Sequence, residues 1–262
     1  MRRSFRVSEA EPQWRTVGDD ARRIAIRKRA GAGPGLFWLG GFRSDMIGTK
    51  AEALDALAAR KGLACTRFDY SGHGESEGAF TDGTIGRWLE DAVAVFRAET
   101  AGPQVVVGSS MGGWIALLLA RTLLAAGEGD RLKALVLIAP APDFTEELMW
   151  ANFGPAERDR LETEGVLLLP NEYGDEPTPI TRALIEDGRN HLVLGEPIET
   201  GCPVHILQGV RDPDVPYAHA LRLVDGLAGE DVVVTLIKDG DHRLSRPEDL
   251  ERLSAIVSDL VG

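Results

Sequence analysis

Cysteine is almost absent from this chain of 262 residues, which contains two, Cys65 and Cys202. Two cysteines cannot build the disulfide framework of a small secreted protein. Neither lies in a Cys-x-x-Cys pair or in a His/Cys cluster with the spacing of metal ligands. We therefore expect two free thiols in a reducing compartment, a cytoplasmic location and no metal site.

Basic residues are outnumbered by acidic ones. The chain has 29 Lys and Arg against 41 Asp and Glu, which gives a formal net charge of −12 at pH 7. Binding to a phosphate backbone requires a basic surface, so this balance argues against nucleic acid as a partner. It also disfavours electrostatic steering of polyanionic substrates, apart from the effect of any local arginine cluster.

Long apolar runs are missing as well. The longest candidates, residues 114–120 and 132–139, are much shorter than the roughly 18 residues of a membrane span. The basic segment 1–6 is not followed by an apolar stretch, so we expect no secretory signal. Glu9 and Glu11 argue against a transit peptide.

Strand-like and helix-like segments alternate along most of the chain, which is typical of a parallel sheet covered by helices. The sequence predicts strands at residues 23–29, 35–39, 63–69, 104–107, 132–139, 204–208 and 232–237. It predicts helices at residues 49–60, 84–99, 113–120, 216–227 and 247–261. With 44% hydrophobic residues, the chain is long enough for one α/β domain over residues 1–262.

The alternation breaks between about residues 141 and 201, a segment with six prolines and helical patches at 155–164 and 180–190. An insertion between two buried strands predicts a small lid over the mouth of a pocket. Its aromatic residues are Phe144, Trp150, Phe153 and Tyr173. They indicate an apolar acyl or aryl group, or packing of the lid on itself, and we take Trp150 as a candidate substrate contact.

The most informative motif is Gly-Ser-Ser-Met-Gly at residues 108–112. It joins a β-branched run to an apolar, helix-forming stretch, and this strand–turn–helix context is that of a nucleophile elbow. The same G-x-S-x-G pattern recurs around Ser76, but in a charged, glycine-rich loop that no apolar helix follows. That context favours a solvated turn, so Ser110 is the predicted nucleophile.

A serine nucleophile needs a general base within hydrogen-bond reach. Of the five histidines, His242 lies on the loop after the strand at 232–237, where open α/β sheets place their chemistry. The other four are expected in a turn, the lid, a strand and a helix: His73, His191, His205 and His219. His242 is the predicted base.

The base in turn needs an acid that fixes its tautomer. Asp212 and Asp214 compete on the loop after the strand at 204–208, and Asp143 is a third possibility. Asp212 is nearer the strand end and is followed by the rigid Pro213, whereas Asp214 is better placed to cap the next helix. We predict that Asp212 orients His242.

An oxyanion hole needs two backbone N–H donors, one of them from the residue after the nucleophile. The predicted donors are Met111 and Phe42, because two glycines before Phe42 let the backbone turn close to the site. The alternative is an ordinary glycine turn with Ser44 or Asp45 as a helix N-cap. Arg43 beside this loop is a candidate substrate contact for a carboxylate, or else an exposed or salt-bridged arginine.

Together these motifs resemble the α/β-hydrolase superfamily over nearly the whole chain. The matching segments are 40–42, 68–76, 108–112, 209–216 and 240–242. More narrowly, residues 108–114 and 239–245 are similar to the group of the mitochondrial palmitoyl-protein thioesterase and mycophenolic acid acyl-glucuronide esterase. The chain departs from the family at the oxyanion loop, where Gly40-Gly41 stands in place of the usual His-Gly.

The resemblance implies an α/β-hydrolase fold and a cofactor-free hydrolase that cleaves carboxyl esters or thioesters through an acyl-enzyme on Ser110. The implied partner is a small-molecule acyl ester or thioester. Two other functions remain open, because fold alone does not decide among them. One is a non-catalytic small-molecule-binding protein on a hydrolase scaffold, and the other is an acyltransferase. The acyl group, the leaving group and the oligomeric state are not readable from the sequence.

Overall fold

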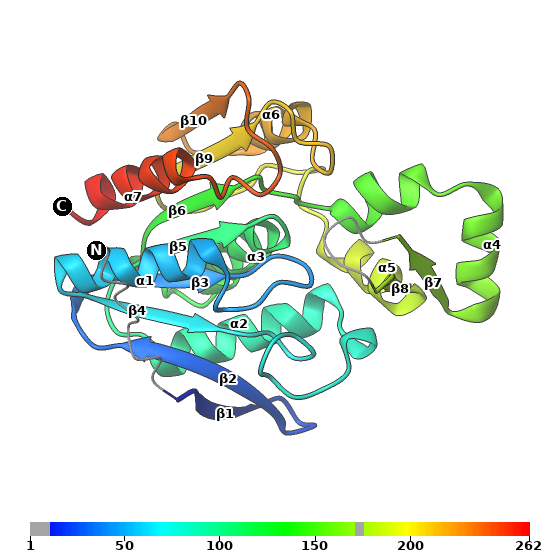
Figure 1. Ribbon diagram of the computed structural model, residues 1–262, viewed down its shortest axis with the longest axis horizontal. Helices are drawn as coiled ribbons and strands as arrows, with labels where there is room; N and C mark the ends of the chain where they lie inside the picture. Colours follow the sequence, from blue (N-terminus) through cyan, green and yellow to red (C-terminus); the bar gives the residue numbers. More distant parts are fainter. Residues whose placement is uncertain (1–10, 171–175) are drawn as a thin grey trace, which may run out of the picture.

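The computed structural model describes residues 11–170 and 176–262, so the expectations for the N-terminal segment 1–10 and for Tyr173 lie outside the described residues. Its centre is an eight-stranded sheet in the order β1-β2-β4-β3-β5-β6-β9-β10 (Figure 1). The strands are β1 (Gln13–Val17), β2 (Arg22–Arg29), β3 (Ala32–Leu39), β4 (Leu63–Phe68), β5 (Gln104–Ser109), β6 (Leu132–Ile138), β9 (Val204–Gly209) and β10 (Val232–Ile237). From β4 to β10 all neighbours pair in parallel, whereas β2 pairs antiparallel with both β1 and β4.

Helices cover both faces of the sheet. The longer helices of the main body are α1 (Thr49–Lys61), α2 (Ile85–Glu99), α3 (Met111–Ala125), α6 (Tyr217–Gly226) and α7 (Pro247–Val261), and the short ones are η1 (Phe80–Asp82) and η2 (Gly129–Arg131). Successive strand residues point to opposite faces. Leu36 of β3 therefore packs in one core cluster with α1 and α7, while Phe37 packs in the other with α2, α3 and α6. Because both faces are covered, the central strands are continuously apolar rather than alternating.

The segment between β6 and β9 is the one for which the sequence predicts an insertion. It contains η3 (Thr145–Met149), η4 (Trp150–Asn152), α4 (Pro155–Glu164), β7 (Val166–Leu169), β8 (Thr178–Thr181), α5 (Arg182–Gly188) and η5 (Arg189–His191). In Figure 1 these elements form a separate group beyond the ends of the parallel strands. β7 and β8 make a second, antiparallel sheet, and a small cluster that includes Phe153 and Leu161 packs within the group. Its role as a lid stays a prediction.

The mostly parallel sheet flanked by helices is confirmed. The structure also contains three strands that the sequence did not predict, β1, β7 and β8. β1 buries only Val17, so its sequence lacks the alternation that marks a half-buried strand. β7 and β8 have four residues each, too few for a clear period. The helix expected from residue 180 begins at Arg182, because the Thr181 side chain accepts a hydrogen bond from the Leu184 N–H at 3.1 Å.

Among the described residues, none of the helices combines the length and the apolar character that a bilayer crossing requires. α3 is apolar along most of its 15 residues because it is buried on nearly every side.

Candidate active site

Ser110 lies at the bend between β5 and α3. Its backbone angles, φ 54° and ψ −116°, fall outside the regions that residues with side chains ordinarily adopt. The bend is held by two hydrogen bonds, from the Ser110 N–H to the Ile138 carbonyl and from the Gly113 N–H to the Ser110 carbonyl, both 2.8 Å. Strain of this kind persists where the surrounding structure enforces it, and it concentrates at functional sites.

The two glycines of the motif are required by close packing of backbone against backbone. A Cβ atom on Gly108 would lie 2.3 Å from the Gly112 carbonyl oxygen, and one on Gly112 would lie 2.1 Å from the Leu39 carbonyl oxygen. No side chain fits at these separations. The glycines therefore let β5, α3 and the end of β3 approach closely at the bend.

The structure brings Ser110, His242 and Asp212 together from three separate loops. His242 Nε2 lies 3.1 Å from Ser110 Oγ, and His242 Nδ1 lies 2.8 Å from Asp212 Oδ2. A carboxylate accepts hydrogen bonds, so the proton of the neutral ring belongs on Nδ1 and the lone pair on Nε2. In that tautomer Nε2 can accept the Ser110 hydroxyl proton.

Asp212 is held as an acceptor by four hydrogen bonds. Oδ1 accepts from the backbone N–H groups of Asp214 at 2.9 Å and Val215 at 2.8 Å, and Oδ2 accepts from Gln208 Nε2 at 3.2 Å as well as from His242. The Asp212 side chain is fully buried. Sequence reasoning missed Gln208, although a polar residue at the end of an apolar strand was a signal for it.

The other two carboxylates considered for this role have different surroundings. Asp143 accepts from the backbone N–H groups of Val193 and Leu194 at 2.9 Å each, which ties the start of the insertion to its end, and burial raises the pKa of this carboxyl. Asp214 is exposed. One of its carboxylate oxygens, one oxygen of Asp212 and one ring nitrogen of His242 lie within 4.8 Å of one another. Such a cluster resembles a metal site, but His242 Nδ1 and both Asp212 oxygens already take part in hydrogen bonds.

A cavity of about 880 Å³ opens at Ser110 and His242, and both predicted oxyanion donors line it. The Met111 N–H is the first of α3 and has no acceptor within the helix. Phe42 lies on the loop between β3 and α1, which approaches the bend closely. A Cβ atom on the preceding Gly41 would lie 3.6 Å from Ser110 Cβ.

The two candidate substrate contacts have different positions. Arg43 lines the cavity, and its guanidinium donates to the Pro177 carbonyl at 3.1 Å and to Thr178 Oγ1 at 2.8 Å in the insertion. Trp150 is absent from the residues that line the cavity, and its ring lies 5.0 Å from the Arg158 guanidinium and 4.8 Å from that of Arg189. A substrate contact by Trp150 stays a prediction that this packing does not favour. The insertion instead presents an apolar wall of Phe144, Leu148, Met149, Leu169 and Ile180 to the cavity.

Comparison with known proteins decides the family. The model of the alpha/beta hydrolase family matches residues 30–253. The chain belongs to this family. The hydrolase is 33% identical over 244 residues to palmitoyl-protein thioesterase ABHD10, mitochondrial, of Homo sapiens, an alignment that covers 92% of the chain and 78% of the relative.

Solved structures agree with this assignment. A hydrolase-like protein of Agrobacterium vitis S4 superposes with a TM-score of 0.93 at 52% identity, over 96% of this hydrolase and 99% of that chain. Alpha/beta hydrolase domain-containing protein 10 from mouse superposes with a TM-score of 0.85 at 32% identity, over 96% and 98% of the two chains. The expected fold class and the resemblance to the palmitoyl-protein thioesterase group are confirmed.

The expected cytoplasmic location is wrong, as the names of the curated relatives indicate. The curated relatives from several mammals are all named as mitochondrial proteins. The error has a physical reason: free thiols indicate a reducing compartment, but they do not distinguish one such compartment from another.

Proposed function

We propose that this hydrolase cleaves acyl thioesters and carboxyl esters through an acyl-enzyme on Ser110. The observation that carries the proposal is the pair of hydrogen bonds from Ser110 Oγ to His242 at 3.1 Å and from His242 to Asp212 at 2.8 Å. A hydroxyl, an imidazole and a carboxylate in this order are the parts that activate a serine.

In the proposed reaction His242 Nε2 takes the hydroxyl proton as Ser110 Oγ attacks the acyl carbonyl. The N–H groups of Met111 and Phe42 stabilise the oxyanion of the tetrahedral intermediate. His242 then gives its proton to the departing thiol or alcohol. Water, activated by the same ring, attacks the acyl-enzyme and releases the acid, while the Asp212 carboxylate stabilises the imidazolium in both halves.

The acyl group is proposed to be apolar. Its supporting observation is the row of apolar side chains that the insertion presents to the cavity beside Ser110. Thioesters are included among the proposed substrates because relatives are named as palmitoyl-protein thioesterases. The insertion would then act as the lid that covers the acyl chain and excludes water.

The test is labelling with a fluorophosphonate probe, together with hydrolysis of p-nitrophenyl butyrate and of an acyl thioester. Ser110→Ala is expected to lose the label and about 10⁴-fold or more of kcat. Ser76→Ala is the matched control, because Ser76 stands in the second G-x-S-x-G sequence and its Oγ donates to the Asp69 carbonyl at 2.7 Å. It should keep both the label and the activity.

Three results would contradict the proposal. Wild-type protein that is folded but takes no label would favour a binding protein. Undiminished hydrolysis by Ser110→Ala would exclude Ser110 as the nucleophile. Transfer products that exceed hydrolysis when alcohols or amines are added would identify an acyltransferase.

A further inference from the structure

The loop after β4 lies directly against the loop that carries Phe42. His73 on this loop, for which the sequence predicts a turn role, is 4% exposed. Its Nε2 lies 3.2 Å from the backbone nitrogen of Arg43, and its Nδ1 lies 3.3 Å from the Ser71 carbonyl oxygen. An amide N–H donates and a carbonyl accepts, so the two partners together require a neutral ring with its proton on Nδ1.

The surroundings keep that ring neutral. The aromatic rings of Tyr70, Phe80 and Trp88 pack around His73, with centroids 5.7, 5.1 and 5.1 Å away. Burial first, and the charge of Arg43 to a smaller extent, lower the pKa of His73 to about 4. A protonated ring would turn Nε2 into a donor that faces another donor, the Arg43 N–H.

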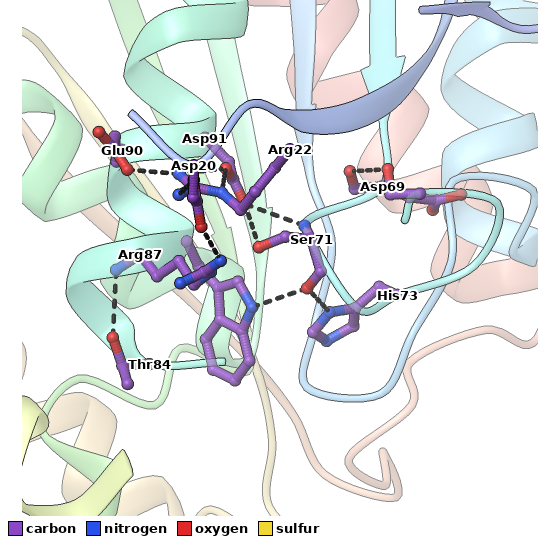
Figure 2. A network of polar contacts seen from close by, with 11 residues as sticks. Asp20, Arg22, Asp69, Ser71, His73, Thr84, Arg87, Glu90 and Asp91 are labelled. Carbon is purple, nitrogen blue, oxygen red and sulfur yellow. Dashed lines mark hydrogen bonds and ion pairs between the residues drawn. The ribbon is translucent and has the colours of Figure 1, made fainter. Parts of the chain in front are cut away.

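A buried polar network holds His73 at its Nδ1 side through the Ser71 carbonyl, as Figure 2 shows. The Ser71 carbonyl, which accepts the hydrogen bond from His73 Nδ1, also accepts one from Trp88 Nε1 at 3.1 Å. Ser71 donates its backbone N–H and its hydroxyl to Asp91 Oδ2, at 2.9 and 2.7 Å. The fully buried Asp91 is in turn paired with Arg22 of β2 at 3.1 Å. The ring is therefore fixed to rigid elements, β2 and α2, rather than to a free loop.

The partner of His73 lies in a turn that has unusual geometry. Arg43 has φ 57°, and it is the third residue of a turn closed by a hydrogen bond of 3.1 Å from the Ser44 N–H to the Gly41 carbonyl. Glycine is the usual residue at a turn position with positive φ, so arginine there needs support from outside the turn. The Gly41 carbonyl and the Phe42 N–H belong to one planar peptide and point in opposite directions. The turn that His73 supports therefore sets the direction of the Phe42 N–H.

We propose that His73 is a positioning residue for the oxyanion hole. Its neutral Nε2 holds the Arg43 N–H, keeps the turn at residues 41–44 in its strained form, and so aims the Phe42 N–H at the acyl oxygen. The inference rests on the function proposed above, because it assigns a task to one of the two donors. Without the acceptor the turn relaxes and the donor moves away from the developing charge, which affects the transition state more than the bound substrate.

The test compares His73→Gln with His73→Asn, which differ by one methylene. The Gln amide oxygen reaches the place of Nε2 and can accept from Arg43, whereas the Asn oxygen ends near the place of Nδ1 and cannot. We expect His73→Gln to retain kcat within about threefold and His73→Asn to lose about 10- to 100-fold of kcat with KM nearly unchanged. A trifluoromethyl ketone, which forms an oxyanion on the serine, should bind more weakly to His73→Asn by a similar factor.

His219→Asn is the matched control. Like His73, His219 is buried, at 5% exposed, and is bonded to the backbone, since its Nε2 donates to the Pro142 carbonyl at 2.7 Å. It does not contact the turn at residues 41–44. A purely structural role for His73 predicts that both Asn variants lower Tm and leave the kcat of the folded fraction alone. Equal kcat in His73→Gln, His73→Asn and wild type would overturn the inference.

The tautomer of His73 provides a second test that does not depend on folding of a variant. Nitrogen-15 NMR of the wild-type protein should show a neutral ring protonated on Nδ1 down to about pH 5. A ring protonated on Nε2, or one that titrates near pH 6.5, overturns the inference. Fluorophosphonate labelling separates the two proposals: an unlabelled wild type refutes the proposed function, whereas a labelled wild type with a fully active His73→Asn refutes only the role of His73.

Discussion

Replacing Asp212 with asparagine removes one acceptor from a carboxylate that accepts four hydrogen bonds. Oδ1 faces two backbone N–H groups, at 2.9 and 2.8 Å, which cannot reverse their polarity. The amide oxygen of the variant must occupy that position, so its NH₂ group faces His242 Nδ1. His242 must then accept at Nδ1 and carry its proton on Nε2, where it can no longer receive the proton of Ser110.

The size of the effect follows from this loss of tautomer. A wrong tautomer in a serine hydrolase of otherwise intact geometry lowers kcat by about 10⁴-fold. At 1.36 kcal/mol for each factor of ten, this corresponds to about 5 kcal/mol of transition-state stabilisation. The fold should persist, because the two bonds to Oδ1 remain and the side-chain volume is unchanged.

The assay is kcat for p-nitrophenyl butyrate hydrolysis, with thermal unfolding to show that the variant is folded. Asp214→Asn is the control, because Asp214 is an exposed carboxylate two residues away, and we expect it to lose less than tenfold. A folded Asp212→Asn enzyme with kcat within tenfold of wild type would refute the reasoning. A larger loss in Asp214→Asn than in Asp212→Asn would assign the orienting role to Asp214.

Two further predictions concern stability. Gly112→Ala places a methyl group 2.1 Å from the Leu39 carbonyl oxygen and should lower the free energy of unfolding by roughly 3 kcal/mol or more. Gly195→Ala, which meets no atom within 4 Å, should change it by less than about 1 kcal/mol in urea unfolding, and similar losses in both variants would contradict the packing argument. His73 has a pKa of about 4 when folded against 6.5 as its ordinary value, so its contribution to stability is complete above pH 6.5 and is lost as the pH falls toward 4. His73→Gln should lack this part of the pH dependence, up to about 3 kcal/mol, and a stability curve unchanged by the substitution would exclude a buried neutral ring.

Most of the sheet and its main helices could be predicted because their signals are local. Runs such as Val105 to Val107 show continuous apolar character, and α2 carries a clear apolar stripe along its length. The missed strands lack such signals: β1 is largely exposed, and β7 and β8 form only because the insertion packs on itself. Trp150 illustrates the same limit, since the sequence around an aromatic residue does not reveal whether its ring lines a cavity or packs against two arginines.

The sequence alone determined the place and shape of the bend at Ser110, because the strand, the glycines and the helix that create it lie within a few consecutive residues. Tertiary structure decided which groups face that bend. Ser110 and His242 are 132 positions apart in the chain, and only the folded structure shows that their side chains lie 3.1 Å apart. The tertiary structure likewise decided the protonation state of His73, because the neutrality of an imidazole depends on burial and on partners that come from four different segments of the chain.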